Sequence, residues 1–477
     1  MTLVAKIAHS TFYQTVGKIA AVLLGLWQVS LLTKYLGNTG YGTYATVTAY
    51  LGIIIVLAEL GLHITNVTKI SQPGADERKI LSNAFTLRTV SSLIFFAVAT
   101  VVGYFFLPFE YEIRLGIVFA AAAFALLSVN QVFVGVFQKN FANHMLVFGE
   151  IISKSIVVAA IYILVTKGYG VLAILATLNL AFAVHLGVTM YFAYKYIPFS
   201  FQFDFSYWRL LLSQSWPIAF SGILNLIYFK TDTVILAGYK GAAAAGIYSV
   251  PYKILEVLIA FPALFAGLLL PLLSAAAINN LVRFKAIIQN AFNALIYIAF
   301  LVMVEVMIFA EPMIRFITRE KFFEFTESVP LFRLLIITTL FLFVGNLFGH
   351  AVPALGLQRK MILGYALAAG AGLAVYFTLI PRFSFYGAAL GTILTEAIAA
   401  FYSMWLVLKT TRHKLEYKGL IKTIVASVIT YWLGTIIFIR FGITWWIAAV
   451  LVAIIYIIIL YKLKGITKDE IKMVLAR

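Results

Sequence analysis

The sequence contains no cysteine, and only 11% of its 477 residues are charged. Without cysteine the chain can form no disulfide, no thiolate metal site and no cysteine nucleophile. Soluble domains carry about 25% charged residues, so a soluble protein of this length would need more polar surface than this chain can supply. Acidic residues are the scarcest charged type, with 18 Asp and Glu against 36 Lys and Arg. These deficits exclude an ordinary soluble domain.

Motifs of the common enzyme classes are missing as well. The sequence has no Walker A loop, no G-x-S-x-G serine motif and no H-E-x-x-H metal motif. The histidines of the apolar segments show no metal-ligand spacing: His63, His185 and His350. We therefore expect a protein that is not an enzyme, with no catalytic residues, no metal site and no cofactor.

The chain is rich in long apolar segments. Apolar residues make up 63% of it, and the mean hydropathy is +1.00. The apolar runs continue for about 20 residues without alternating at a period of two, which predicts membrane-spanning helices and not a barrel. We expect an all-α integral membrane protein with about fourteen transmembrane helices. The first apolar segment reaches Lys34, too far for the core of a cleaved signal peptide.

Lys and Arg are concentrated in one set of alternating loops between the expected spans. This positive-inside pattern places those loops and both termini in the cytoplasm. The net charge of +18 is thus explained by topology, and we expect no nucleic-acid partner. The expected location is the cytoplasmic (inner) membrane, crossed many times.

A short motif occurs twice in the chain. Residues 37–44 read GNTGYGTY and residues 241–248 read GAAAAGIY, so both fit G-x4-G-x-Y, with the second copy 204 positions after the first (241 − 37). A second pair of matching sites supports the repeat. The dipeptide Tyr-Gly occurs at 169–170 and again at 386–387, 217 positions later (386 − 169), and each copy begins the sixth span of its six-span unit. We interpret the glycines as tight turns between helices and the tyrosines as anchors at the membrane interface.

The repeat predicts two pseudo-symmetric six-helix lobes. Because six is even, both lobes have the same orientation, so their pseudo-twofold axis runs along the membrane normal. The expected division is residues 1–200 for an N-lobe of spans one to six and 201–410 for a C-lobe of spans seven to twelve. Residues 411–477 then form two additional spans and a cytoplasmic tail.

The sequence around the second motif resembles a known family. Residues 229–253, FKTDTVILAGYKGAAAAGIYSVPYK, are similar to the signature of the seventh and eighth spans of polysaccharide-export flippases, the Wzx-like members of the MOP superfamily. Residues 36–44 and 385–391 resemble that family too, and the similarity covers roughly residues 10–410. The family has no strict motif for substrate contacts, so no functional residue is carried over from it.

This resemblance implies a fold and a function. The implied fold is a V-shaped pair of lobes around a central cavity. The implied function is translocation of a polyprenyl-diphosphate-linked oligosaccharide from the cytoplasmic to the outer leaflet by alternating access. Such a protein serves cell-surface polysaccharide biosynthesis, for example of the O-antigen of lipopolysaccharide. Its expected partners are the lipid-linked oligosaccharide, membrane lipid, and a glycan polymerase or ligase.

Four basic residues inside the apolar spans are candidates for binding the diphosphate. A charge at the centre of a membrane helix costs roughly 2.5–3.5 kcal/mol, so Lys18, Lys154, Lys253 and Arg333 should face a cavity. Other interpretations remain open: Lys18 could extend to the interface, Lys154 could form a structural pair with Glu150, and the other two could be outer gates or headgroup anchors. Two further cations are interpreted as interface anchors: Arg88 and Lys230.

Polar residues at helical spacing indicate where a cavity wall lies. Gln14 and Gln28 share one face of the first span, and Asn225, Tyr228 and Asp232 share one face of the seventh. A polar stripe on a membrane helix must turn away from lipid, so we expect both stripes to line the cavity.

Three carboxylates within the spans are candidates for ion coupling: Glu396, Glu59 and Glu305. Glu396 ranks first because it lies near the middle of its span, where a carboxylate removed from water can carry a proton. A structural hydrogen bond is the alternative. Uphill transport without a nucleotide site would need an H+ or Na+ gradient.

Three other functions are compatible with parts of the pattern. A lipid II flippase of the MurJ type would also have fourteen spans and a cationic interior. A MATE-type cation-coupled multidrug exporter is disfavoured, because organic cations call for an acidic lumen and twelve spans. A scaffold for a glycan-assembly complex would transport nothing.

Overall fold

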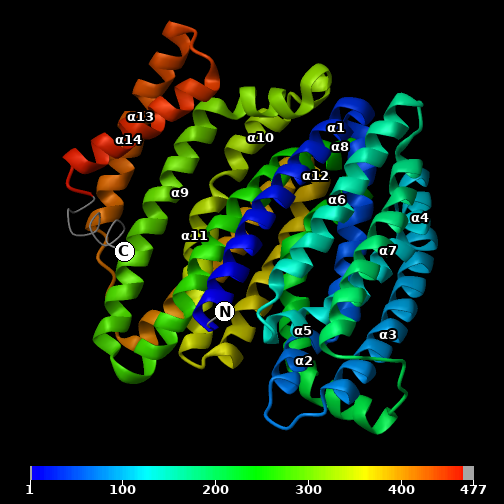
Figure 1. The fold of residues 1–477 in the computed structure, drawn as a ribbon. Helices are drawn as coiled ribbons and strands as arrows, with labels where there is room; N and C mark the ends of the chain where they lie inside the picture. Colours follow the sequence, from blue (N-terminus) through cyan, green and yellow to red (C-terminus); the bar gives the residue numbers. More distant parts are fainter. Residues whose placement is uncertain (1–2, 466–477) are drawn as a thin grey trace. The chain divides into compact units, whose positions relative to one another are not determined.

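The computed structural model describes the backbone of residues 3–465, and the side chains of residues 13–465 apart from 15, 64, 217, 218, 221, 225–229, 440 and 441. Within this range every regular element is a helix, which confirms the all-α prediction (Figure 1). Helices are the expected elements, because hydrocarbon offers no partners for backbone groups and a helix satisfies them internally.

The helices of the first half, with two short inner ones and a 3-10 turn, are α1 (Leu3–Glu59), α2 (Leu62–Ile70), α3 (Glu77–Phe105), α4 (Tyr111–Asn130), η1 (Gln131–Phe133), α5 (Val134–Lys139), α6 (Asn143–Thr166) and α7 (Val171–Tyr196). Those of the second half are α8 (Phe205–Asn279), α9 (Leu281–Thr318), η2 (Arg319–Phe325), α10 (Ser328–Leu335), α11 (Thr338–Ala354), α12 (Gln358–Thr411), α13 (Lys418–Phe441) and α14 (Trp445–Lys462).

Three of these helices are interrupted by one non-helical residue. The interruptions are at Gly37 in α1 (φ 67°), Gly241 in α8 (φ 81°) and Ser384 in α12 (φ 53°). Eleven segments in the described part of the chain are long and apolar enough to cross a membrane. Helices α1, α8 and α12 each divide into two at their interruption, which agrees with the expectation of about fourteen spans. The left-handed glycines confirm the tight turns that the repeat predicted.

The chain forms two compact units. The first comprises Met1–Ser249 with the short segments Ile317–Glu324 and Ile380–Phe385, and the second comprises the remainder. The three-part division predicted from the repeat, at residues 200 and 410, stays a prediction.

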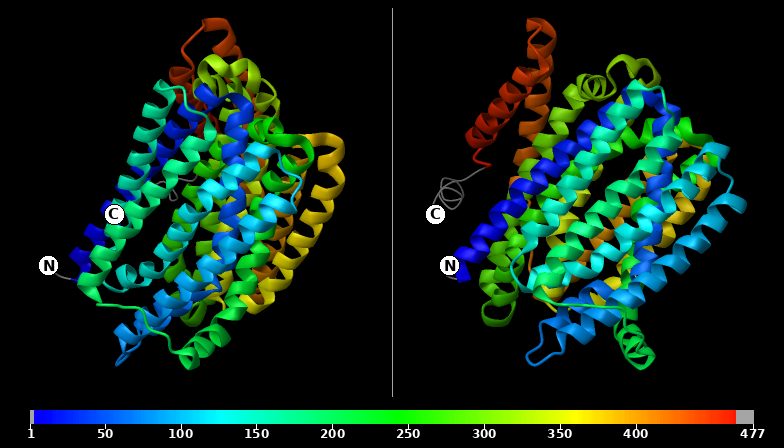
Figure 2. Two further views of the ribbon diagram at one scale, coloured as in Figure 1. Left: turned by 90° about the vertical axis from the view of Figure 1, so that its right-hand side faces the viewer. Right: turned by 45° about the vertical axis from the view of Figure 1, so that its right-hand side comes forward.

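In the first unit, α1 and α7 each pack against α4 and α6 and also touch each other, and α3 packs against α1 and α4 (Figure 2). The second unit has its core on α9. Ile288, Leu295 and Phe300 of α9 are buried in one cluster with residues of α11, α12, α13 and α14.

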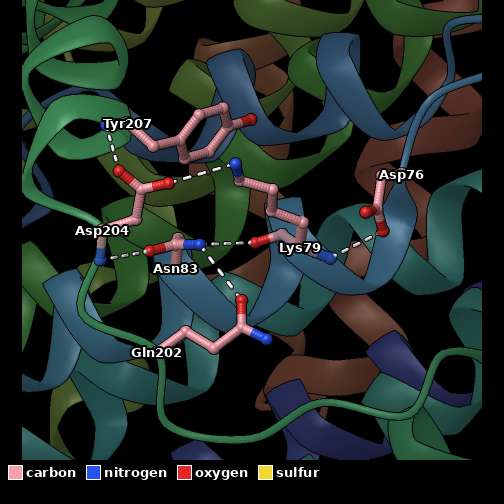
Figure 3. Close-up of polar contacts among 6 residues, drawn as sticks. All are labelled: Asp76, Lys79, Asn83, Gln202, Asp204 and Tyr207. Carbon is pink, nitrogen blue, oxygen red and sulfur yellow. Dashed lines mark hydrogen bonds and ion pairs between the residues drawn. The ribbon is translucent and has the colours of Figure 1, made fainter.

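The segment that joins α7 to α8 is fastened to α3 (Figure 3). Backbone N–H groups of Ser200, Gln202 and Asp204 donate to side-chain oxygens of α3. The carboxylate of Asp204 also forms an ion pair with Lys79 of α3, with an Nζ–Oδ2 distance of 3.1 Å. Asp76 caps the start of the same helix by accepting the N–H of Lys79. This connection is therefore held to the first unit up to the beginning of α8.

Candidate functional site

Two of the four basic residues predicted to bind the diphosphate form ion pairs with the same carboxylate in the first unit. Glu150 on α6 lies between Lys154, one turn further along the same helix, and Lys18 on α1. The Nζ–Oε distances are 3.0 Å to Lys154 and 3.3 Å to Lys18. Lys154 also donates to the backbone oxygen of Ala21 at 3.0 Å. The three side chains, here called the lysine cluster, join α1 to α6 with a net charge of +1.

The lysine cluster is accessible. The exposed fractions of the side chains are 51% for Lys18, 32% for Lys154 and 28% for Glu150. Each ammonium group has three N–H donors, so an incoming anion can be bound by donors that do not face Glu150. The arrangement can bind a polyanion while Glu150 keeps the two cations together in its absence.

A histidine supports α6 next to this cluster. A methyl group on Gly149 would lie 2.9 Å from the ring of His185 on α7, so only glycine lets the two helices approach this closely. The Nε2 atom of buried His185 is hydrogen-bonded to the side-chain amide of Asn130 at 3.2 Å. Sequence analysis gave His185 no role, because a single histidine in an apolar helix carries no spacing signal.

The repeated tyrosines make equivalent hydrogen bonds. Gln28 Nε2 donates to Tyr44 at 2.6 Å, and Tyr248 donates to Asp232 Oδ2 at 2.6 Å. Both pairs are separated by sixteen residues, and the second follows the first by the same 204 positions as the motif (232 − 28). The expectation that these tyrosines anchor at the membrane interface is wrong for Tyr248, which is fully buried.

Asp232 is one of the most deeply buried charged residues, with 1% exposure. Its Oδ1 atom accepts the backbone N–H of Thr233 at 2.6 Å. The predicted role of Gln28 and Asp232 as cavity polar groups stays a prediction, and so does that of half-buried Gln14. The side chains of two other members of the predicted stripe lie outside those that the structure describes: Asn225 and Tyr228.

The other two predicted cations lie in the second unit. Lys253, after the break in α8, pairs with Glu256 at 2.8 Å one turn along the helix. Arg333 on α10 is exposed. Their proposed contact with substrate stays a prediction.

Arg88 was expected to be an interface anchor, and that expectation is wrong. Its side chain is 1% exposed, and it donates to the backbone oxygens of Ser128 at 3.0 Å and Ile55 at 3.4 Å. A cavity of about 10 Å3, bordered by Glu59 and Asn66, adjoins the guanidinium. This is about the space that one water molecule needs.

The three candidate carboxylates for ion coupling have different surroundings. Glu59 borders the cavity beside Arg88. Glu396 on α12 is buried, close to Tyr365. Glu305 on α9 has both carboxylate oxygens buried, and neither accepts a hydrogen bond from the described part of the chain.

Comparisons with known proteins agree with this architecture. The family model described as "Polysaccharide biosynthesis protein" matches residues 7–277. No curated protein matches the sequence.

Solved structures with the same fold are transporters of the MOP superfamily. A structure of the lipid II flippase MurJ in an inward closed conformation has a TM-score of 0.79 at 13% identity, and the match covers 97% of this chain and 99% of that one. An inward-facing MATE-family multidrug transporter has a TM-score of 0.68 at 14% identity, with 82% and 94% covered. A MOP transporter from Pyrococcus furiosus, described as having a binding pocket of reverse polarity, has 0.61 at 14%, with 85% and 95% covered. At these identities the likeness shows the fold alone.

Proposed function

We propose that this chain, which belongs to the polysaccharide biosynthesis protein family, is a flippase for a polyprenyl-diphosphate-linked oligosaccharide. It moves this lipid from the cytoplasmic to the outer leaflet by alternating access, for cell-surface polysaccharide biosynthesis. The family match and the transporter fold support a membrane flippase. The observation that carries the finer assignment is the lysine cluster, an accessible pair of ammonium groups on apolar helices.

The chemistry of the lysine cluster suits a diphosphate. Phosphate oxygens accept charge-assisted hydrogen bonds, which are about twice as strong as neutral ones. Before substrate arrives, Glu150 neutralises one of the two positive charges of Lys18 and Lys154 and so lowers the cost of keeping them on apolar helices. A diphosphate would compete with Glu150 for both ammonium groups.

The position of the cluster along α1 suits loading from the cytoplasm. Lys18 precedes the break at Gly37 by nineteen residues (37 − 18), which is about 29 Å of helix at 1.5 Å per residue. Since Gly37 belongs to the loops with few bases, Lys18 lies toward the cytoplasmic end of its span. An oligosaccharide lipid made on the cytoplasmic face would reach this end first.

The location follows from the same charge bias: we place the protein in the cytoplasmic membrane with both termini inside. Because the chain has no cysteine, single-cysteine variants test this directly. A cysteine at Gln72 should react only with permeant maleimide in intact cells, and one at Lys167 should also react with an impermeant reagent. Reaction of Gln72→Cys with the impermeant reagent would reverse the topology.

The proposed transport is tested with purified protein in liposomes that contain a defined polyprenyl-diphosphate oligosaccharide. Leaflet-resolved labelling of the sugar should show protein-dependent movement. The test variants are K18Q and K154Q, and K195Q is the matched control, since Lys195 is a lysine at the end of α7 that packs over the ring of Tyr191. Movement at wild-type rate in K18Q/K154Q liposomes would contradict the assigned site, and no movement with any lipid-linked glycan would contradict the function.

A lipid II flippase of the MurJ type is the second candidate. This candidate is supported by coverage: the match to the MurJ structure covers 97% of this chain, whereas the match to the MATE structure covers 82%. Competition between lipid II and an O-antigen-type lipid for the reconstituted protein would separate the two.

A multidrug exporter is the third candidate, and a drug-susceptibility panel with an overexpressing strain tests it. A glycan polymerase or ligase as partner is tested by affinity isolation from native membrane.

A further inference from the structure

Glu305 is a carboxylate inside the second unit whose oxygens have no hydrogen-bond donor. It lies near the middle of α9, and both Oε atoms are buried within the described part of the chain. An ionised carboxylate without a partner costs far more in a membrane interior than a protonated one, because burial penalises the charged form. Its surroundings therefore suit a neutral carboxyl group.

The face of α9 that carries Glu305 packs on α13. A methyl group on Gly434 would lie 2.8 Å from Ile308 Cδ1, and the rings of Phe309 and Phe438 meet edge to face at 5.1 Å. Residues three and four positions apart share a helix face, so Glu305, three before Ile308 and four before Phe309, lies on the face that meets α13.

The matching position on α13 carries a hydroxyl group. The two helices run in the same direction, since Gly419 lies close to Tyr297 and Gly434 lies close to Ile308. Thr430 is one turn before Gly434 on the same face of α13, which packs on both α9 and α14, and its side chain is fully buried. Its Oγ1 atom has no hydrogen-bond partner among the described residues either.

We propose that Glu305 binds the proton that couples transport to a proton gradient, in a site that α9 and α13 build together. A threonine hydroxyl can accept the O–H of a protonated carboxyl and can donate to the ionised form. No hydrogen bond joins Thr430 to Glu305 in this structure, so Thr430 is the donor that Glu305 would gain on losing its proton. The inference rests on the proposed function, names its coupling ion, and gives α13, one of the two additional spans, a part in transport.

The helices packed around α9 carry several other titratable groups, among them His350 on α11, Tyr365, Glu396 and Tyr402 on α12, Tyr431 on α13 and Tyr456 on α14. No group in the described part of the chain donates to the Glu305 oxygens. Tyr456 donates to the backbone oxygen of Tyr297, and His350 pairs with a backbone oxygen of its own helix. Protonation of Glu305 therefore breaks no hydrogen bond within the described part of the chain.

The experiment measures the carboxyl directly and then its role. Infrared spectra of the full-length protein in liposomes should show the C=O band of a protonated carboxylic acid at neutral pH. Glu305→Gln should remove that band, and Thr430→Val should shift it while leaving the carboxyl in place. Glu311→Gln is the matched control, because Glu311 is an exposed glutamate of the same helix, paired with Arg315 at 3.0 Å. A spectrum in which Glu305→Gln removes no such band overturns the inference.

Flipping of a defined polyprenyl-diphosphate oligosaccharide is then followed with an imposed pH gradient or Na+ gradient. The pH gradient should stimulate the wild type and E311Q but not E305Q, which should still bind the lipid. Stimulation of E305Q by the pH gradient, or of the wild type by Na+ alone, overturns the inference and leaves the flippase assignment standing. If the wild type moves no glycan lipid, the proposed function fails, while the infrared result still reports on Glu305.

Discussion

The carboxylate of Glu324 accepts a hydrogen bond from the backbone N–H of Asn38 at 2.9 Å, at the start of the helical segment that follows the break in α1. Glu110 does the same for Ala242, at 3.2 Å, after the break in α8. Asn38 and Ala242 are equivalent in the sequence repeat, 204 positions apart (242 − 38). Each acid belongs to the opposite half of that repeat, so the two halves exchange caps at their outer turns.

The backbones of these two turns also come into close contact at the second glycine of each motif, Gly42 and Gly246. A methyl group on Gly42 would overlap the backbone oxygen of Ala242, and one on Gly246 would overlap that of Asn38. Glycine is therefore required at both positions, because a side chain would not fit between the two backbones. Gly37 and Gly241, in contrast, are required for their positive φ angles.

Gly42→Ala should lower the stability of the protein in detergent, by about 1–3 kcal/mol, because overpacking forces the backbones apart. Gly25→Ala is the control on the same helix, since nothing lies within 4 Å of its added methyl group. It should be neutral or stabilise by up to about 1 kcal/mol from helix propensity. Thermal unfolding of both variants measures the contrast. Equal melting temperatures for the two variants would mean that the close approach does not exist.

Glu324→Ala should loosen the outer turn of α1, because it removes a cap that contributes about 0.5–2 kcal/mol and a negative charge at a helix start. Glu110→Ala should act alike on α8, and Glu112→Ala, an exposed neighbour, is the control. Accessibility of a single cysteine at Asn38 to an impermeant maleimide reports the opening. An unchanged rate in Glu324→Ala would show that the carboxylate does not hold the turn.

The motif and its spacing predicted the two turns. The contacts between the turns could not be predicted from the sequence. Gly37 and Gly241 were expected at turns because only glycine takes a positive φ without strain. That Gly42 and Gly246 meet each other's turns depends on the packing of helices far apart in sequence, which periodicity does not encode. The buried pairing of Tyr248 with Asp232 was missed for the same reason.

Charges within spans were predicted with mixed success. Lys154 and Glu150 were recognisable as a pair because four residues separate them on one helix, whereas the approach of Lys18 required the packing of α1 on α6. Arg88 was misassigned, because its distance from the end of the span suggested an anchor. Its real partners are backbone oxygens, which carry no sequence signal.

Lys154→Gln should weaken binding of the diphosphate headgroup roughly tenfold to a hundredfold, because one charge-assisted hydrogen bond contributes about 1.5–3 kcal/mol. Glu150→Gln should strengthen binding, since it removes the competing carboxylate. Competition by soluble pyrophosphate against a fluorescent lipid diphosphate measures both. The control Lys195→Gln should bind like the wild type. A weaker affinity in Glu150→Gln would mean that the carboxylate orients the lysines instead of competing with the ligand.

Asp232→Asn should leave the fold intact, because the equivalent position, Gln28, already carries a neutral amide that pairs with Tyr44. Tyr248→Phe should cost more, about 1–3 kcal/mol, since it leaves a buried carboxylate oxygen without its donor. Thermal unfolding of the two variants and of Tyr44→Phe compares the paired sites. A larger loss in Asp232→Asn than in Tyr248→Phe would show that the charge itself stabilises the helix.

Asp204 provides a pH test of the connection between α7 and α8. The N–H of Tyr207 and then the ammonium of Lys79 lower the pKa of Asp204 below its ordinary value of 3.8. A group whose pKa is lower in the folded state stabilises the fold fully above its unfolded pKa, and this contribution disappears as the pH falls through the folded pKa. The melting-temperature difference between the wild type and Asp204→Asn should therefore be constant from neutral pH down to about pH 5 and should vanish on further acidification. Asp76→Asn is the comparison from the same cluster (Figure 3), and a difference that grows on acidification would contradict the assigned direction.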